Sequence, residues 1–224
     1  MCGRYVRRSD KQRIITHFLV EDPLFDISPS YNVAPSTMQP AVGLNADTGE
    51  REILMMRWGL IPTWYKDPKH LGMSTINAKA ESLLEKPMWR QAFKKRRCLI
   101  PADAFLEWKK LDAKSKQPYA FALTNNEPFA FAGIWERWKK PDGTNLDSFA
   151  IITTDPNKLA VHNRMPVILE PHDYSRWLTR VDEEPRPIDL LRPIDAEKMK
   201  SWKVSKDVGN VRNNNASLLV DVGV

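Results

Sequence analysis

The second half of the chain alternates short apolar runs with turn residues, a pattern typical of β-strands. These runs predict strands over residues 98–100, 104–109, 119–123, 129–135, 149–154 and 167–169, and a last apolar strand after the asparagines at 213–215. In the first half, the apolar segments 38–44 and 53–60 flank a turn-rich stretch, 45–49, which predicts a β-hairpin.

Helical spacing of apolar residues is confined to short segments. The first predicted helix has Ser9 as its N-cap and places Ile14, Ile15, Phe18 and Leu19 on one stripe. Further short helices are predicted over 76–85, over 88–95, from 155 to about 162–166, and over 171–178. Residues 28–35 and 183–193 contain prolines and show no period, so we expect an ordered loop and a surface connection there.

Composition narrows the class of protein. The chain has 224 residues with 42% hydrophobic content, enough for a substantial core, and we expect one domain over residues 1–224. No stretch approaches the roughly 20 apolar residues of a membrane span, and the start lacks the apolar region of a signal peptide, so a soluble, cytoplasmic protein is expected. The net charge of +6 favours polyanionic partners but establishes none.

The metal-ligating residue types show no pattern of a metal site. Cys2 and Cys98 form no CxxC pair, and the four histidines, at 17, 70, 162 and 172, are scattered through the chain. Neither zinc nor a structural disulfide is therefore expected. Cys98 follows Arg97 and precedes an apolar pair, which suggests an inert buried thiol.

The start of the chain, Met1-Cys2-Gly3-Arg4, offers a distinctive chemistry. Removal of Met1 would leave Cys2 with a free α-amine, of pKa about 7.7–8.0, beside a thiol, of pKa about 8.5. An aldehyde condenses with such an amine to an imine, and the thiol then closes a stable five-membered thiazolidine. Many proteins begin Met-Cys by chance, so these residues alone do not decide the function.

Two further polar residues are candidates for proton transfer. By alternation along an apolar strand Glu107 shares a face with Phe105, so partial desolvation would raise its pKa toward that of a useful general acid. An edge-strand carboxylate in water is the alternative. His162 lies two residues before Arg164, and a core imidazole is its alternative role.

Seven short motifs, spread over nearly the whole chain, keep polar residues in apolar surroundings. They are Met1-Cys2-Gly3-Arg4, Tyr31-Asn32-Val33-Ala34-Pro35, Arg57-Trp58-Gly59-Leu60-Ile61-Pro62-x-Trp64, Ile76-Asn77-Ala78-Lys79-Ala80-Glu81, Arg97-Cys98-Leu99-Ile100-Pro101, Glu107-Trp108 and His162-x-Arg164-Met165-Pro166-Val167-Ile168-Leu169. In order and spacing they closely resemble the SRAP (SOS response-associated peptidase) family. That family captures abasic sites in single-stranded DNA covalently, through a thiazolidine formed by its N-terminal cysteine.

The resemblance implies a role for each catalytic candidate. Cys2 would supply the amine and the thiol, and Asn77 would orient the reacting group. Glu107 and His162 would handle protons during opening and closure of the sugar ring. No metal ion or organic cofactor is implied.

The resemblance also implies the DNA-binding residues. Arg4 and Arg164 would hold phosphates that flank the lesion, as guanidinium groups do well. Trp64 and Trp108 would stack on bases or wedge beside the lesion, worth about 1–3 kcal/mol per stacked base, with burial in a core as the alternative. Lys79 would bind DNA where the family usually has arginine, keeping the charge but losing the bidentate fork.

Two other departures affect the same region. Ala104 and Leu106 stand where the family commonly has a glycine and a second aromatic residue, which puts the local stacking surface in doubt. Thr153 and Thr154 fall near a family position close to the lesion, and the sequence does not decide between them.

We therefore expect an α+β protein whose mixed, mostly antiparallel strands curl into a barrel-like core, with helices outside and a basic groove across one face. It would act as a monomer on abasic sites in single-stranded DNA, at the nucleoid when on DNA, and not at a membrane. Two alternatives remain open: an N-terminal-cysteine peptidase or autoprocessing enzyme with Cys2, His162 and Glu107 as nucleophile, base and orienting residue, or a non-catalytic single-strand-binding module.

Overall fold

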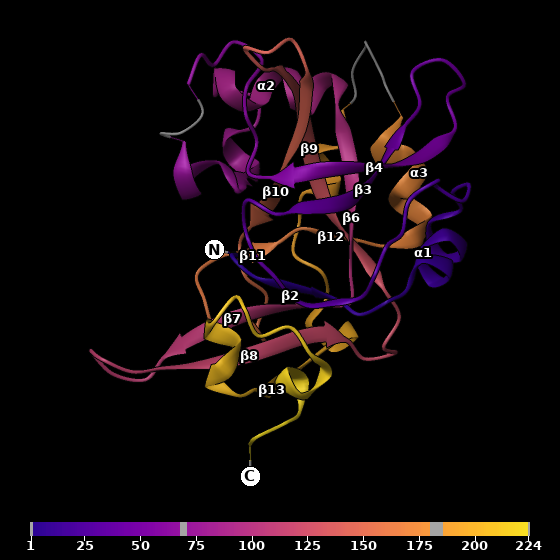
Figure 1. Ribbon diagram of the computed structural model, residues 1–224. Helices are drawn as coiled ribbons and strands as arrows, with labels where there is room; N and C mark the ends of the chain where they lie inside the picture. The colour runs from indigo at the N-terminus through magenta and orange to yellow at the C-terminus, as the bar shows by residue number, and fades with distance from the viewer. Residues whose placement is uncertain (1, 68–70, 180–185, 224) are drawn as a thin grey trace.

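Five long strands close into a barrel in the computed structural model, which describes residues 2–67, 71–179 and 186–223 (Figure 1). The barrel strands are β3 (Met38–Leu44), β4 (Arg51–Trp58), β6 (Arg97–Ala102), β9 (Phe129–Lys139) and β10 (Asn145–Thr154). They follow the order β10-β4-β3-β6-β9, and β9 pairs again with β10 to close the ring. Only the β10–β4 contact within this ring is parallel.

The predicted hairpin is confirmed in β3 and β4. These strands pair antiparallel from Met38 opposite Arg57 to Leu44 opposite Arg51. In the connecting turn, the Asn45 side-chain oxygen accepts hydrogen bonds from two following backbone N–H groups, a local arrangement that favours turns.

Three short strands extend the barrel sheet: β5 (Asn77–Lys79) beside β10, β11 (Met165–Pro166) beside β10, and β12 (Ile168–Leu169) beside β9. The predicted helix over 76–85 is wrong, because residues 77–79 pair in parallel with β10 and only η3 (Ala80–Ser82) forms a helical turn. A three-residue strand whose partner is a distant segment leaves no period in the local sequence.

A second, five-stranded sheet lies below the barrel in Figure 1. Its order is β13 (Met199–Lys203), β8 (Lys116–Leu123), β7 (Ala104–Lys110), β1 (Tyr5–Arg7) and β2 (Ser30–Val33). The sequence did not predict β1, β2 or β13, and the loop expected over 28–35 is wrong at residues 30–33. Strand β2 is an edge strand, where flanking prolines are tolerated.

Alternate residues of the barrel strands face two different environments. One set packs against the helices α1 (Lys11–Phe18), α2 (Pro87–Lys95) and α3 (Tyr174–Leu178). The other set, which includes Met56, Trp58, Phe131 and Phe149, packs with aromatic residues of the second sheet. Since helices can cover only the outside of a barrel, the second set fills its interior. The predicted α+β class, with a barrel-like core and peripheral helices, is confirmed.

The helix predictions succeed in the strongly periodic segments. Helix α2 matches 88–95 closely, and the 3₁₀ turn η4 (Pro171–Asp173) runs into α3 as predicted for 171–178. Helix α1 forms, but Asp10 is its N-cap because the buried Ser9 instead donates its backbone N–H and hydroxyl to Asp103. Leu19 is 76% exposed at the left-handed C-cap and not on the buried stripe.

Two other predicted elements are absent from their expected positions. Residues 155–164 form turns and bends instead of a helix, with Asn157 bonding locally to the Leu159 N–H and across to the Ile194 carbonyl. The final strand is instead the 3₁₀ turn η8 (Ala216–Leu219).

The other helical elements of the described residues are single 3₁₀ turns. They are η2 (Gly72–Thr75), η5 (Ile188–Leu190), η6 (Ala196–Lys198) and η7 (Lys206–Gly209). Of the expected surface connection over 183–193, residues 183–185 lie outside the described residues. In the described part of the chain, no helix is long and apolar enough to cross a membrane.

Candidate functional site

Cys2 lies where the barrel meets the second sheet. Its side chain is fully buried with the residues of the barrel interior, and its Sγ approaches the Arg4 carbonyl at 4.0 Å. The strand that follows, β1, pairs with β7, and the Arg4 carbonyl accepts a hydrogen bond from the Leu106 N–H at 3.0 Å. This pairing fixes the start of the chain beside β7.

Asn77 holds the backbone of Cys2 from the barrel side. Its Nδ2 donates to the Cys2 carbonyl at 2.8 Å, and β5 positions it opposite Ile151 of β10. The Asn77 Oδ1 is buried and accepts no hydrogen bond from the described residues. A buried acceptor of this kind costs free energy unless something donates to it, so the Asn77 Oδ1 has room for one more hydrogen-bond donor.

Glu107 of β7 is only 6% exposed, so the solvated edge-strand alternative does not hold. Burial raises the pKa of its carboxyl group to about 7. Burial also raises the pKa of the Cys2 thiol, and the negative charge of Glu107 raises it further. The two groups are therefore within electrostatic reach of each other, and at neutral pH the thiol stays protonated beside a carboxyl group poised to accept or donate a proton.

His162 lies on the exposed segment between β10 and β11, not in a core. Partial burial lowers the pKa of its imidazole, and the nearby positive charge of Lys116 lowers it further. The ring is thus held in its neutral form near pH 7, the form that accepts a proton.

Arg164 is engaged by several acceptors of the protein. Its Nη1 and Nη2 bond to the two carboxylate oxygens of Glu81 at 2.9 and 2.8 Å. Nη1 also bonds to Asp155 at 3.2 Å and Nη2 to the Thr153 carbonyl at 2.5 Å. These contacts tie the segment that bears His162 to η3, so a DNA phosphate at Arg164 would have to share or displace two carboxylates.

Arg4 reaches the C-terminal part of the chain through Asn32. Its Nη1 donates to the Asn32 Oδ1 at 3.0 Å. The Asn32 Nδ2 in turn bonds to three backbone carbonyls, those of residues 208, 210 and 213, at 2.8–3.1 Å. The Arg4 guanidinium lies 6.0 Å from the centre of the Trp108 ring. Trp108 is half-buried on the face of β7 opposite to Glu107, where it packs with Leu106.

Trp64 and Lys79 lie on the surface. Trp64 is 60% exposed, with the Tyr65 ring as its neighbour at 5.6 Å. Lys79 is exposed at the end of β5, opposite Thr153. Both threonines that the sequence left open are buried, and their hydroxyls donate to backbone carbonyls, Thr153 to Ala78 at 3.5 Å and Thr154 to Leu191 at 3.1 Å.

The structure thus brings Cys2, Asn77 and Glu107 together, and it places Arg4 against Trp108 on the opposite face of β7. Sequence reasoning missed Asn32 and Glu81 as site residues. Both stand inside the quoted motifs, as polar residues in short aperiodic segments. In the described part of the chain, no three His, Cys, Asp or Glu residues cluster as metal ligands.

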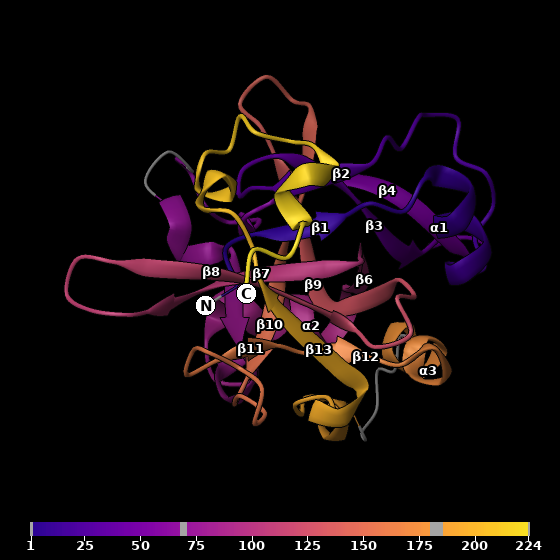
Figure 2. The same cartoon turned by 90° about the horizontal axis from the view of Figure 1, so that it is seen from below.

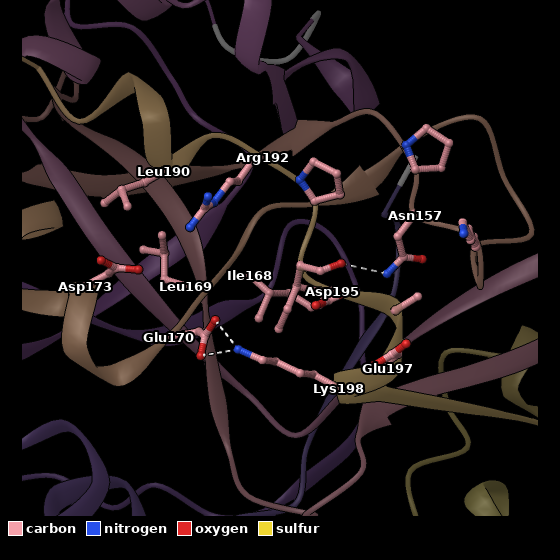
Figure 3. Close-up of a pocket in the computed structure, with 15 residues that line it drawn as sticks. Asn157, Ile168, Leu169, Glu170, Asp173, Leu190, Arg192, Asp195, Glu197 and Lys198 are labelled. Atoms are coloured by element: carbon pink, nitrogen blue, oxygen red, sulfur yellow. Dashed lines mark hydrogen bonds and ion pairs between the residues drawn. The ribbon is translucent and has the colours of Figure 1, made fainter.

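A cavity of about 540 Å³ lies elsewhere, between the 156–158 segment, β12 and residues 190–198 (Figure 3). Its lining mixes acidic and basic side chains, and the Lys198 ammonium contacts both Glu170 carboxylate oxygens at 2.7 and 2.8 Å. None of the nine expected site residues lines it. The chemistry at Cys2, and not the shape of the surface, therefore locates the candidate site.

Comparison with known proteins shows the family of this chain. The profile of the SOS response associated peptidase (SRAP) family matches residues 1–211. The chain belongs to the SRAP family. This SRAP protein is 42% identical to the abasic site processing protein YoqW of Bacillus subtilis (strain 168), over 98% of its own chain and 99% of the relative.

More distant relatives match the same SRAP domain. The abasic site processing protein HMCES of Rattus norvegicus is 32% identical over 85% of this chain and 64% of its own length. Among solved structures, a protein from Bacteroides thetaiotaomicron superposes with a TM-score of 0.86 at 25% identity, over 99% of this chain and 100% of that one.

Proposed function

We propose that this SRAP protein processes abasic sites in DNA, as its relatives' names indicate for them, and that it captures them in single-stranded DNA as a covalent thiazolidine at Cys2 after removal of Met1. One observation carries the proposal. The second residue is held by the Asn77 amide at 2.8 Å, within electrostatic reach of a buried carboxyl group of pKa about 7.

The reaction balances without a metal ion or cofactor. The closed sugar of the abasic site opens to its aldehyde, and the Cys2 amine adds to that carbon to give a carbinolamine. Loss of water gives the imine. The sulfur then adds to the imine carbon while the thiol proton ends on nitrogen, which closes a ring of sulfur, two cysteine carbons, nitrogen and the former aldehyde carbon.

Each proton transfer has a candidate group. Opening the sugar needs a proton on the ring oxygen, and loss of water needs another on the departing hydroxyl. Glu107 is suited to both, because its pKa of about 7 leaves it partly protonated at neutral pH. His162, held neutral, is suited to accept the proton that the amine or the thiol releases.

The proposal also assigns residues to the DNA contacts. Arg4 and Arg164 are proposed to hold phosphates beside the lesion, with Lys79 as an additional cation. The exposed Trp64 and the half-buried Trp108 are proposed to stack on bases. We further propose that the protein acts as a monomer, at the nucleoid.

The test is the intact mass of the protein after mixing with abasic single-stranded DNA. Wild type is expected to form an adduct that survives denaturation. Cys2→Ser should give no stable adduct but an imine that borohydride traps, because the amine survives without the sulfur. Cys98→Ala, which removes the other buried thiol, should crosslink like wild type.

Two results would reject the proposal. Stable crosslinking by Cys2→Ser would exclude the thiazolidine. If wild-type protein whose first residue is confirmed to be Cys2 bound the DNA without forming any adduct, a non-covalent binding module would be favoured.

A further inference from the structure

The hairpin between β7 and β8 ends in a cluster of positive charge. Four exposed lysines surround its tip: Lys109, Lys110, Lys114 and Lys116. Within the described part of the chain, none of them forms an ion pair. Asp112 is the one acidic residue between 108 and 117. Its carboxylate accepts hydrogen bonds from the backbone N–H groups of Lys114 and Ser115 and from the Ser115 hydroxyl, so it stabilises the turn and pairs with none of the lysine side chains.

This arrangement works against the stability of the hairpin. Lys110 lies directly opposite Lys116 in the β7–β8 register. Like charges directly opposite one another destabilise a pair of strands. A bound anion between them would remove that repulsion, whereas a purely structural hairpin gains nothing from it.

The lysines directly follow Glu107 on strand β7, with Lys109 on the Glu107 face and Lys110 on the opposite face. Arg4 lies over the Trp108 ring at 6.0 Å, and Trp108 shares a face of β7 with Lys110, two residues on. The charge of Lys116 also lowers the pKa of His162, which places this lysine within electrostatic reach of the segment that bears His162. In Figures 1 and 2 the hairpin projects beyond the body on the side where the chain begins.

We propose that residues 108–117, the basic arm, bind the phosphates of single-stranded DNA that flanks the abasic site. The arm extends the interface of the proposed function beyond the lesion itself. From Glu107 to Lys110 three strand residues span about 10 Å, or roughly three nucleotides at the 3.4 Å rise of a stacked strand. The lysines would therefore contact phosphates of the DNA that lie beyond the two nucleotides next to the lesion.

The first test compares two variants that lose the same charge on different hairpins. Lys110→Gln/Lys114→Gln alters the basic arm, and Lys139→Gln/Lys140→Gln alters the β9–β10 turn, at the top of Figure 1. Binding to undamaged single-stranded DNA is measured against salt concentration. The arm variant should lower the slope by about 0.7 for each phosphate that the arm no longer neutralises, while the control keeps the wild-type slope. Equal slopes for arm variant and wild type would overturn the proposal.

The second test uses the length of the substrate. A trinucleotide with a central abasic site ends before Lys110, whereas a long strand reaches it. The arm variant should form adducts several-fold more slowly on the long strand at subsaturating concentration, and this loss should shrink on the trinucleotide. A loss of the same size on both substrates would overturn the proposal.

A third measurement separates binding from folding. Without DNA, Lys110→Gln should raise the midpoint of thermal unfolding, because it removes the Lys110–Lys116 repulsion, while Lys139→Gln, whose partner is Asn145, should not. A lower unfolding midpoint for Lys110→Gln would show that Lys110 stabilises the fold, and it would contradict the proposed role in DNA binding. If wild type formed no adduct on any substrate, the proposed function would fail while the salt slopes still decide the role of the arm.

Discussion

Glu107 is a buried carboxyl group, and its burial disfavours the charged form. Its pKa rises from 4.5 to about 7 on folding. Between these values the folded protein holds a proton that the unfolded chain has released, so stability falls as pH rises through this window. The site therefore carries a stability cost at neutral and alkaline pH that is absent in acid.

We expect Glu107→Gln to remove this cost. Relative to wild type, the variant should gain up to about 3 kcal/mol in free energy of unfolding at pH 8, and the gain should vanish at pH 4. Urea unfolding at the two pH values measures it. The exposed Glu50, changed to Gln, is the control and should leave the pH profile of wild type intact. Parallel profiles for Glu107→Gln and wild type would contradict the prediction.

The same residue and His162 should govern rate more than binding. Positioned acids and bases contribute about 10²–10⁴-fold to proton-transfer steps. Glu107→Gln and His162→Ala should slow adduct formation on native abasic DNA, with a smaller defect on a pre-opened aldehyde, and should also slow release of a preformed adduct. Time courses on both substrates test this, and wild-type rates for both variants would remove these residues from the mechanism.

For single residues, the sequence predicted burial where the alternation of a strand decides it. Alternation placed Glu107 on the same face as Phe105 and so indicated burial, but it left an edge-strand carboxylate in water as the alternative. The exposure of His162 was not indicated in this way, because residues 155–164 have no regular structure and their positions depend on the ion pairs of Arg164. Asn32 was missed because its three backbone partners lie more than 170 residues away.

Elements were predictable where they are long or strongly periodic. The β3–β4 hairpin and α2 carry their own signals, in turn residues and in helical spacing. Strands β1, β2 and β5 have three or four residues each, and their hydrogen bonds go to distant segments. Such strands form only when their partner strands are present, so no local sequence pattern predicts them.

The link between η3 and the 155–164 segment gives a prediction at this scale. Glu81→Gln removes the carboxylate that competes with phosphate for Arg164, so binding to undamaged single-stranded DNA should tighten several-fold. Fluorescence anisotropy measures it. Asp155→Asn, whose partner contact is longer at 3.2 Å, should have a smaller effect. Weaker binding by Glu81→Gln would mean that Arg164 serves to hold the segment and not the DNA.

The whole molecule is organised by the filled interior of the barrel. Gly133 of β9 lies opposite Cys98, and a Cβ built there would approach the Cys98 Sγ at 2.8 Å and Ile100 at 3.0 Å. We expect Gly133→Ala to cost about 1–3 kcal/mol in free energy of unfolding, because the interior has no room for another methyl group.

A matched control exists on another barrel strand. A Cβ at Gly43 of β3 would meet no atom within 4 Å, so Gly43→Ala should be neutral or stabilising by up to about 1 kcal/mol. Urea unfolding of both variants measures the difference. Equal stabilities would show that the interior can relax around the added methyl group.

The candidate site is a property of the whole molecule because it lies at the junction of two sheets. Its residues come from the start of the chain, from β5 and β7, and from the segment after β10. No single window of sequence brings these together, which is why only the full series of motifs pointed to them.

The burial of Cys2 also sets an order of events during synthesis. The start of the chain cannot dock until β7 exists, since β1 pairs with residues 104 and 105. At 5–20 residues per second, translation reaches Glu107 after about 5–20 s. An aminopeptidase must draw the first residues into its own active site, so the start of the nascent chain stays open to removal of Met1 for at least this interval. Folded protein that still carries Met1 should resist the same enzyme until it is unfolded.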